Sequence, residues 1–369
     1  MLPGELADVE AWQEKPALVR GNAVSIVEPS ENRVEPRCPH FRKCGGCQYQ
    51  HMADAAQPAA KVEILREVLR RVGKVEPPER IAVEEGPMWE YRNRIQLHFD
   101  ERLMGFFAAG SNDIAAIDSC AVASPRLSRA ISSFRAMKRD RAWPRFVRSI
   151  ELFTNESEVQ VNVLDSGPKH VNRSFFEWCE EALPGALTPS LDYQTANGVF
   201  RVSHKSFFQV NRFLVDKLVE VALGDAAGEE AWDLYAGVGL FSMALSRRFQ
   251  RVTAVEAVNS AAADLEHNAA LNNAPIRAVR ASTENFLAAS AAAPEFVLAD
   301  PPRAGLDKKA VDALVKLRPK RIALVSCDPS TLARDLAGLV QGGYSIESMT
   351  MVDLFPQTSH IESVTRLSL

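Results

Sequence analysis

The stretch "WDLYAGVGLFSMAL", residues 232–245, decides the fold, because an apolar run ends at two glycines and passes directly into a helical pattern. Glycines at 237 and 239 allow a tight turn and a close approach of the backbone to a ligand. The stretch lacks the third glycine of G-x-G-x-x-G, so it does not support a dinucleotide-binding fingerprint. It predicts a strand, a ligand-binding turn and a helix, which together begin a βαβ unit.

Six further apolar runs alternate with helical stretches downstream of this turn. They are RVTAVE (251–256), IRAVRA (276–281), EFVLA (295–299), RIALVS (321–326), YSIESMTMV (344–352) and SVTRLSL (363–369). Strands that alternate with helices indicate βαβ units and a mostly parallel sheet. Together with an amphipathic pattern over 212–223, they predict a doubly wound α/β domain with a seven-stranded, Rossmann-like sheet at 206–369.

The residues before this domain show a different pattern. An apolar stripe over 59–72 predicts a helix. Strand-like runs follow at 91–99, 146–154 and 158–164. Their mixture with fewer helical pieces predicts a central α+β domain with an antiparallel sheet at 38–205. Short alternating runs, separated by glycine and proline, predict strands in 1–37.

The composition is that of an ordinary globular protein. The chain has 369 residues, 46% of them hydrophobic and 24% charged, with a formal net charge of −4. Any nucleic-acid partner must therefore meet a local concentration of positive charge. No run of 18 apolar residues and no signal-peptide pattern is present in the sequence, so we expect a cytoplasmic protein without a membrane partner.

The six cysteines are unevenly spaced, which predicts a ligand cluster. Cys38, Cys44 and Cys47 lie close together in a loop-like stretch, and Cys120 is the candidate fourth ligand. His40 or His51 could substitute for one of them. Spacing alone leaves structural zinc and an iron–sulfur cluster open. Cys179, in a helical segment, is interpreted as a core residue.

Polar side chains follow several of the predicted strands of the C-terminal domain. Glu256 ends the second strand, where an acid can accept hydrogen bonds from a ribose diol. Asp300 ends the fourth strand, immediately before two prolines that cannot continue the ladder. Cys327 follows the fifth strand, and by itself it is either a packing residue or a nucleophile at a cleft.

Five motifs together give the sequence a resemblance to a known family. They are SFFQVN (206–211), DLYAGVGLF (233–241), LADPPRAGL (298–306), VSCDPSTLARDL (325–336) and DLFPQTSHIESV (353–364). In this order and spacing they resemble the RNA uridine-C5 methyltransferases, which make 5-methyluridine from S-adenosylmethionine (SAM). The resemblance implies a SAM-dependent methyltransferase domain and an RNA substrate.

The resemblance also implies roles for individual residues. The expected cofactor-binding residues are Gln209, Tyr235, Gly237, Gly239, Glu256 and Asp300. Cys327 would add to C6 of the uracil, because C5 accepts a methyl group only after a nucleophile has added at C6. Glu362 would then remove the C5 proton, and the cysteine would leave by elimination. Leu240 stands where many relatives carry Asn, which removes one expected contact to the methionine part of the cofactor.

The cysteine cluster and the N-terminal residues extend the resemblance. "CPHFRKCGGCQYQ" (38–50) with the distant Cys120 is similar to family members that bind a [4Fe–4S] cluster, which favours the cluster over zinc. No redox step occurs in the methylation scheme, so its expected role is structural or RNA-positioning. Residues 1–37 resemble only the latter half of a TRAM domain, a small RNA-binding barrel.

The expected substrate is a uridine in large-subunit (23S) ribosomal RNA, and we expect a monomeric enzyme. The alternatives are a tRNA uridine-C5 methyltransferase and a non-catalytic, cluster-bearing RNA-binding protein. The basic stretch 129–148, with Trp143 and Phe146, and the segment YRNR at 91–94 are candidates for gripping RNA by charge and stacking. For the basic stretch, a solvated charged face is the competing interpretation.

Overall fold

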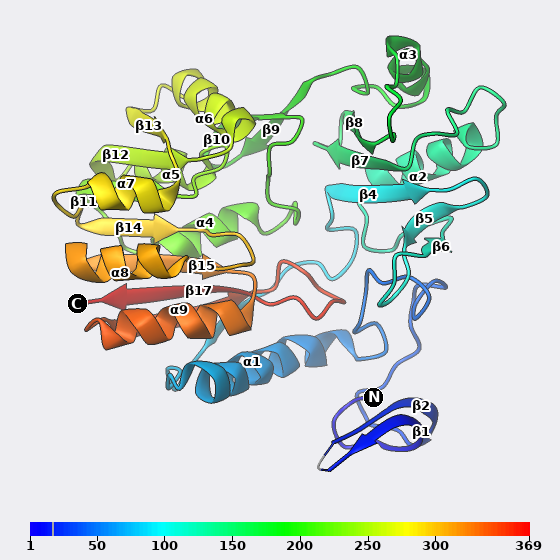
Figure 1. The fold of residues 1–369 in the computed structure, drawn as a ribbon, viewed down its shortest axis with the longest axis horizontal. Coiled ribbons are helices and arrows are strands. Elements are labelled where there is room, and N and C mark those ends of the chain that lie inside the picture. The colour runs from blue at the N-terminus through cyan, green and yellow to red at the C-terminus, as the bar shows by residue number, and fades with distance from the viewer. Residues whose placement is uncertain (17) are drawn as a thin grey trace.

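The computed structural model describes residues 1–16 and 18–369. Its N-terminal part is a hairpin of β1 (Leu6–Lys15) and β2 (Leu18–Glu28), which pair with each other in a two-stranded antiparallel sheet. Most of the hairpin side chains are exposed, and the hairpin lies at one edge of the molecule (Figure 1). Position 17, within the TRAM-like segment, lies outside the described residues.

The central part of the chain forms the expected antiparallel sheet. Its strand order is β6-β5-β4-β7-β8. The strands are β4 (Arg94–Phe99), β5 (Met104–Phe107), β6 (Ile114–Ala116), β7 (Ser149–Thr154) and β8 (Val159–Asp165), with helices α2 (Pro125–Met137) and α3 (Arg173–Ala182). The two helices share one apolar core with the sheet, because Phe134 of α2 and Phe175 of α3 pack with buried strand residues.

The C-terminal part forms the largest sheet of the described residues, in the order β13-β12-β11-β14-β15-β17-β16-β3. Its strands are β3 (Ala82–Glu84), β11 (Gly228–Leu234), β12 (Phe249–Glu256), β13 (Ile276–Arg280), β14 (Phe296–Ala299), β15 (Arg321–Ser326), β16 (Ser345–Val352) and β17 (Glu362–Ser368). All seven predicted runs form strands of this sheet. The predicted number is one too low, because β3 joins from the residues before the central sheet and pairs with β16.

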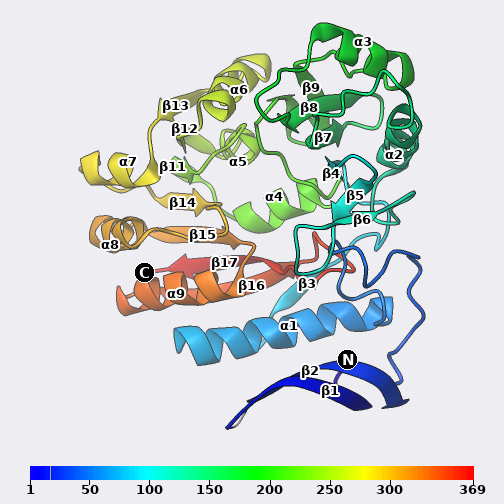
Figure 2. The same ribbon diagram turned by 45° about the vertical axis from the view of Figure 1, so that its right-hand side comes forward.

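Helices cover both faces of this sheet, as its continuous apolar strands require. One face packs against α4 (Val215–Leu223), α5 (Leu240–Leu245) and α6 (Asn259–Leu271). The other face packs against α1 (Gln57–Val68), α7 (Thr283–Ala289), α8 (Lys308–Leu317) and α9 (Pro329–Gln341). Figures 1 and 2 show α1 beside α9.

Two segments of the predicted central domain belong to the cores of the large sheet. Leu65 and Leu69, from α1 and the π-type turn Leu69–Gly73, pack with residues of α8 and α9. The hairpin of β9 (Ser190–Thr195) and β10 (Gly198–Ser203) packs on the opposite face, next to α6. The chain therefore joins the cores of the large sheet, leaves them for the central sheet and returns, so a single boundary at residue 205 does not separate the two parts.

The order of the parallel strands indicates where a ligand would bind on the large sheet. From β11 the chain moves outward to β12 and β13, and then crosses back to β14 and β15 on the other side of β11. Ligands bind outside the carboxyl ends of the strands where the winding direction reverses in this way. None of the described helices is long and apolar enough to cross a membrane.

Candidate active site

The turn after β11 has one glycine that faces open space and one that packs on a helix. Gly237 has φ of 55°, and a Cβ built on it would have no heavy atom within 4 Å. Gly239 has φ of 92°, and its Cβ would lie 2.6 Å from Leu265 Cδ1 of α6. Both need the left-handed region that glycine adopts freely. The turn is therefore open to a ligand at Gly237, whereas Gly239 allows the turn to pack closely on α6.

Glu256 lies at the end of β12 and braces this turn. Its Oε2 accepts a hydrogen bond of 2.8 Å from the Gly237 N–H, and its Oε1 accepts one of 2.6 Å from the Val258 N–H. Tyr235, with φ of 62°, donates from its hydroxyl to Glu284 Oε1 at 3.3 Å. The structure thus brings Tyr235, Gly237 and Glu256 together at the carboxyl ends of β11 and β12.

Two further carboxyl groups come from β11 and from the position after β14. Asp300 follows β14, and Gln209 donates to its Oδ2 at 3.3 Å, so these two predicted residues are brought together. Asp233, in β11, was not predicted as a site residue; its Oδ2 accepts a hydrogen bond from Ser242, while its buried Oδ1 has no partner among the described residues. Burial raises the pKa of both carboxyl groups to about 7. An acid at the penultimate position of the strand before the glycine turn is the signal that could have identified Asp233.

The register of the sheet brings Cys327 and Glu362 to the same edge. β15 and β17 are antiparallel, with Ser326 opposite Ser363. Cys327, which follows Ser326, and Glu362, which precedes Ser363, are therefore the next two residues toward the same edge of the sheet. Burial raises the pKa of the Cys327 thiol to about 11, and the neighbouring Glu362 adds to this shift. Burial, with the charge of Asp300, also raises the pKa of Glu362. The predicted nucleophile and base therefore lie together, 35 residues apart in sequence.

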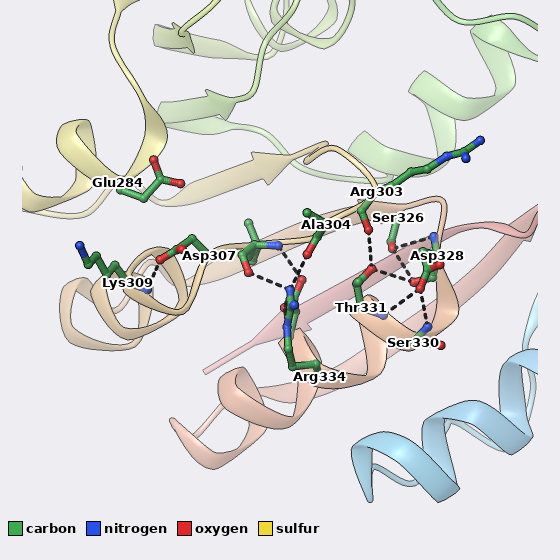
Figure 3. A network of polar contacts seen from close by, with 12 residues as sticks. Glu284, Arg303, Ala304, Asp307, Lys309, Ser326, Asp328, Ser330, Thr331 and Arg334 are labelled. Carbon is green, nitrogen blue, oxygen red and sulfur yellow. Dashed lines mark hydrogen bonds and ion pairs between the residues drawn. The ribbon is translucent and has the colours of Figure 1, made fainter.

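The turn that carries Cys327 is fixed by its neighbours in the sequence. The Ser326 hydroxyl donates to Asp328 O at 3.2 Å, and Asp328 accepts hydrogen bonds from Ser330 N–H and Thr331 N–H at the start of α9. This N-cap stabilises the first turn of the helix. Figure 3 shows this network, in which Thr331 also donates to the backbone oxygen of Arg303.

Arg303 is a further candidate that the sequence reasoning missed. Its backbone is held by Thr331, whereas its exposed side chain points away from the network (Figure 3) and has no hydrogen bond or ion pair within the described part of the chain. The guanidinium acts against burial by lowering the pKa of both Cys327 and Glu362. The residue after the two prolines at a strand end could have been identified as a cation at the cleft.

Alkylation of Cys327 should reveal this electrostatic environment. Because its pKa is about 11, we expect the rate of reaction with iodoacetamide to rise about tenfold per pH unit between pH 7 and 9, in step with the thiolate fraction. Arg303→Met should slow the reaction at each pH, since it removes the charge that favours the thiolate. Mass spectrometry of the peptide gives the rate, and Arg145→Met, an exposed arginine elsewhere, is the control. A rate independent of pH, or unchanged by Arg303→Met, would contradict the assignment.

The four clustered cysteines line one cavity. Cys38, Cys44, Cys47 and Cys120 all border a space of about 370 Å³. In the described part of the chain, however, no three His, Cys, Asp or Glu side chains are arranged to hold a single metal ion. Arg92 also lines the cavity, and its buried Nε lacks a hydrogen-bond partner among the described residues. The structure gathers the predicted ligands without arranging them as a metal-ion site.

The aromatic and basic residues expected to grip RNA are partly internal. Trp143 is buried and packs against Phe134 and Phe175, so it is a core residue. Within 91–94, Tyr91 is buried and donates to Pro356 O, and Arg94 donates to Ser206 O. These side chains are therefore not available for stacking on a base. The arginines of 129–148 that remain exposed are Arg129, Arg135, Arg139, Arg141, Arg145 and Arg148.

Comparison with known proteins identifies the family. The family described as tRNA (Uracil-5-)-methyltransferase matches residues 185–368. The 23S rRNA (uracil(1939)-C(5))-methyltransferase RlmD of Aeromonas hydrophila is 32% identical, over 98% of this chain and 89% of that protein. An uncharacterized RNA methyltransferase of Caldanaerobacter subterraneus is 30% identical, over 98% of this chain and 90% of that protein.

A solved structure agrees with this relationship. The tRNA (uracil-54, C5)-methyltransferase of Pyrococcus abyssi, in complex with S-adenosyl-L-homocysteine, superposes with a TM-score of 0.73 at 25% identity, covering 98% of this chain and 92% of that one. The glycine turn, Glu256, Cys327 and Glu362 lie at one edge of the sheet, the edge where ligands bind in open α/β sheets. The chain therefore belongs to the RNA (uracil-C5)-methyltransferase family of SAM-dependent enzymes.

Proposed function

We propose that this protein methylates C5 of a uridine in 23S ribosomal RNA, with Cys327 as the nucleophile and Glu362 as the base. The observation that carries the proposal is the register of β15 and β17, which sets a thiol and a carboxyl group side by side at the edge of the sheet. The open turn at Gly237 lies at the same ends of the strands. Burial raises the pKa of both the thiol and the carboxyl group, and such perturbed groups gathered at a strand end are typical of a functional site.

The two residues divide the reaction between them. Cys327 loses its thiol proton to solvent, its sulfur forms a bond to C6, and the electron pair of the C5–C6 double bond becomes available at C5. SAM, when bound, supplies the electrophilic methyl group. Glu362 then takes the remaining proton from C5, the double bond re-forms, and the bond between sulfur and C6 breaks. The Arg303 guanidinium favours the charged forms of both residues.

The residues at the strand ends fit a SAM site. At Gly237 the protein backbone has open space in front of it, so a ligand can approach it closely, and Glu256 and Tyr235 lie on either side of this glycine in the turn. Gln209 and Asp300 lie at the adjacent strand end. Gly239 contributes indirectly, by packing on α6. Leu240 is buried, so it offers the cofactor no polar contact.

Transfer of a labelled methyl group from SAM tests the proposed target. Unmodified 23S rRNA and unmodified tRNA are offered separately, and the modified position is mapped. We expect 5-methyluridine in the rRNA, as in the name of the A. hydrophila relative. Methylation of tRNA alone would favour the activity in the name of the P. abyssi structure. Folded protein that binds RNA but methylates neither would overturn the catalytic proposal in favour of an RNA-binding protein.

We also propose that the four cysteines hold a [4Fe–4S] cluster. The support is that Cys38, Cys44, Cys47 and Cys120 border one cavity of about 370 Å³, and that four thiolates are the usual ligands of such a cluster. Arg92, whose buried Nε lacks a hydrogen-bond partner among the described residues, lines the same cavity, where a cluster with four thiolates would supply negative charge. The residues therefore fit such a group chemically, and its role would be structural.

Metal analysis checks this second proposal. Protein purified without oxygen should be brown and contain about four irons per chain. Cys47→Ser should lose the colour, whereas Cys179→Ser, at a buried cysteine of the central core, should keep it. One zinc per chain in a colourless protein would show that the alternative metal is correct. Folded protein with neither metal would contradict both.

A further inference from the structure

The loop between β16 and β17, residues 353–361, leads directly to Glu362 and is held from outside the catalytic sheet. Glu362 is the first residue of β17, so its position depends on the chain just before it. The ends of strands open readily unless the adjoining loop is anchored. The anchor here is the segment 48–61, about 300 residues away in sequence, which runs from the residue after Cys47 into α1.

Gln357 is the centre of this anchor. Its N–H donates to Gln57 Oε1 at 2.9 Å, and Gln57 Nε2 donates back to Gln357 Oε1 at 3.0 Å. Gln357 Nε2 donates to Asp54 Oδ1 at 2.7 Å, and Gln357 O accepts from the N–H groups of Gln48 and Tyr49, both at 2.9 Å. Every polar group of Gln357 is thus bonded to the segment 48–61.

The backbone of Gln357 has an unfavourable conformation that these hydrogen bonds stabilise. Its φ of 68° lies in the left-handed region, which is unfavourable for a residue with a side chain. Such a conformation persists only where the surrounding contacts determine it. Gln57 and Gln357 are both fully buried, so breaking their amide pair would leave polar groups without partners.

Two further contacts extend the anchor along the loop. Gln48 Oε1 accepts a hydrogen bond of 3.1 Å from the Ser359 N–H, and Gln48 directly follows Cys47. Lys61 of α1 donates to Asp353 Oδ1 at 2.6 Å and to Phe355 O at 2.9 Å. The loop is therefore tied at four of its nine positions to one continuous piece of chain, and one tie adjoins the cysteine cluster.

We propose that Gln57 and Gln357 are positioning residues for proton abstraction: through the segment 48–61 they hold the loop that sets Glu362 against C5. The inference rests on the proposed function, because it assigns the loop to the step that Glu362 performs. Loosening the loop should spare the first step, in which Cys327 adds and the methyl group arrives. It should slow the second step, so that enzyme accumulates as a covalent complex with methylated RNA.

The test measures the covalent complex formed with ordinary uridine RNA and SAM during turnover, as protein–RNA adduct that survives denaturation. We expect Gln57→Ala and Gln357→Ala to raise the adduct by about fivefold or more, while single-turnover methyl incorporation stays within about twofold of the parent. Gln48→Ala should give a smaller rise in adduct. Because Gln48 is exposed, we expect this variant to fold like the parent. Gln160→Ala, at a buried glutamine of the central sheet, is the matched control and should give none.

Glu362→Gln separates failure of the inference from failure of the mechanism. It removes the base itself and should give the largest adduct. No adduct with Glu362→Gln would overturn the proposed role of Glu362, and the inference with it. Adduct with Glu362→Gln but none above the parent with the Gln48, Gln57 and Gln357 variants would overturn the inference alone. An equal rise with Gln160→Ala would overturn it as well, because the effect would then be general loosening.

Discussion

Cys327→Ala should reduce methyl transfer to RNA by more than about a thousandfold, because the variant lacks the sulfur that activates C5. Uracil C5 is a poor nucleophile until a group has added at C6, so binding of RNA and SAM cannot compensate for the loss. Single-turnover incorporation of labelled methyl groups measures the effect. RNA binding should be nearly unchanged, since the side chain is small and carries no charge as a thiol with its pKa raised to about 11.

RNA containing 5-fluorouridine at the target tests the same role of Cys327 by trapping the covalent bond between enzyme and RNA. Fluorine cannot leave C5 as a proton does, so the parent enzyme should remain attached to RNA in a complex that survives denaturation. Cys327→Ala should form none. Cys179→Ala, at a fully buried cysteine of the central core, should form as much as the parent. Full methylation by Cys327→Ala would refute the nucleophile assignment.

The positions of several proposed site residues could be predicted because they depend on short-range patterns. Apolar runs mark the strands, and Glu256, Asp300 and Cys327 each lie where such a run ends. In a parallel sheet these ends share one edge, so residues far apart in sequence meet without any knowledge of side-chain packing. The antiparallel pairing of β17 with β15 then adds Glu362 to the group.

Burial and long-range pairing could not be predicted in the same way. Trp143 lies in a stretch rich in arginine, yet its ring packs in the core, because the chain there turns one side chain inward between exposed ones. Gln57 has the sequence context of an ordinary polar residue at the start of a helix. Its complete burial depends on partners that the local pattern does not reveal, which are Gln357 and the backbone oxygens of Tyr49 and Met52. The eighth strand, β3, has only three residues and gives too short a pattern to assign to a sheet.

Lys61→Met should lower the free energy of unfolding by about 3–5 kcal/mol, the usual result of removing one partner from a buried ion pair. Lys61 is fully buried on α1, and its Nζ lies 2.6 Å from Asp353 Oδ1. Without the ammonium group, the Asp353 carboxylate remains in an apolar environment. Urea denaturation measures the loss. Lys308→Met, which breaks an exposed pair with Asp312, is the control and should cost less than about 1 kcal/mol.

The double variant Lys61→Met/Asp353→Leu should recover most of that loss, because burial lowers the pKa of Lys61 despite its partner. A lowered pKa means that the charged ammonium is less stable in the folded protein than in the unfolded chain, so the pair does not offset its own desolvation. A double variant no more stable than Lys61→Met would contradict this. The double variant also lacks the bond from Lys61 to Phe355 O. If it is stable yet accumulates RNA adduct, the ion pair serves the position of the Glu362 loop rather than the stability of the fold.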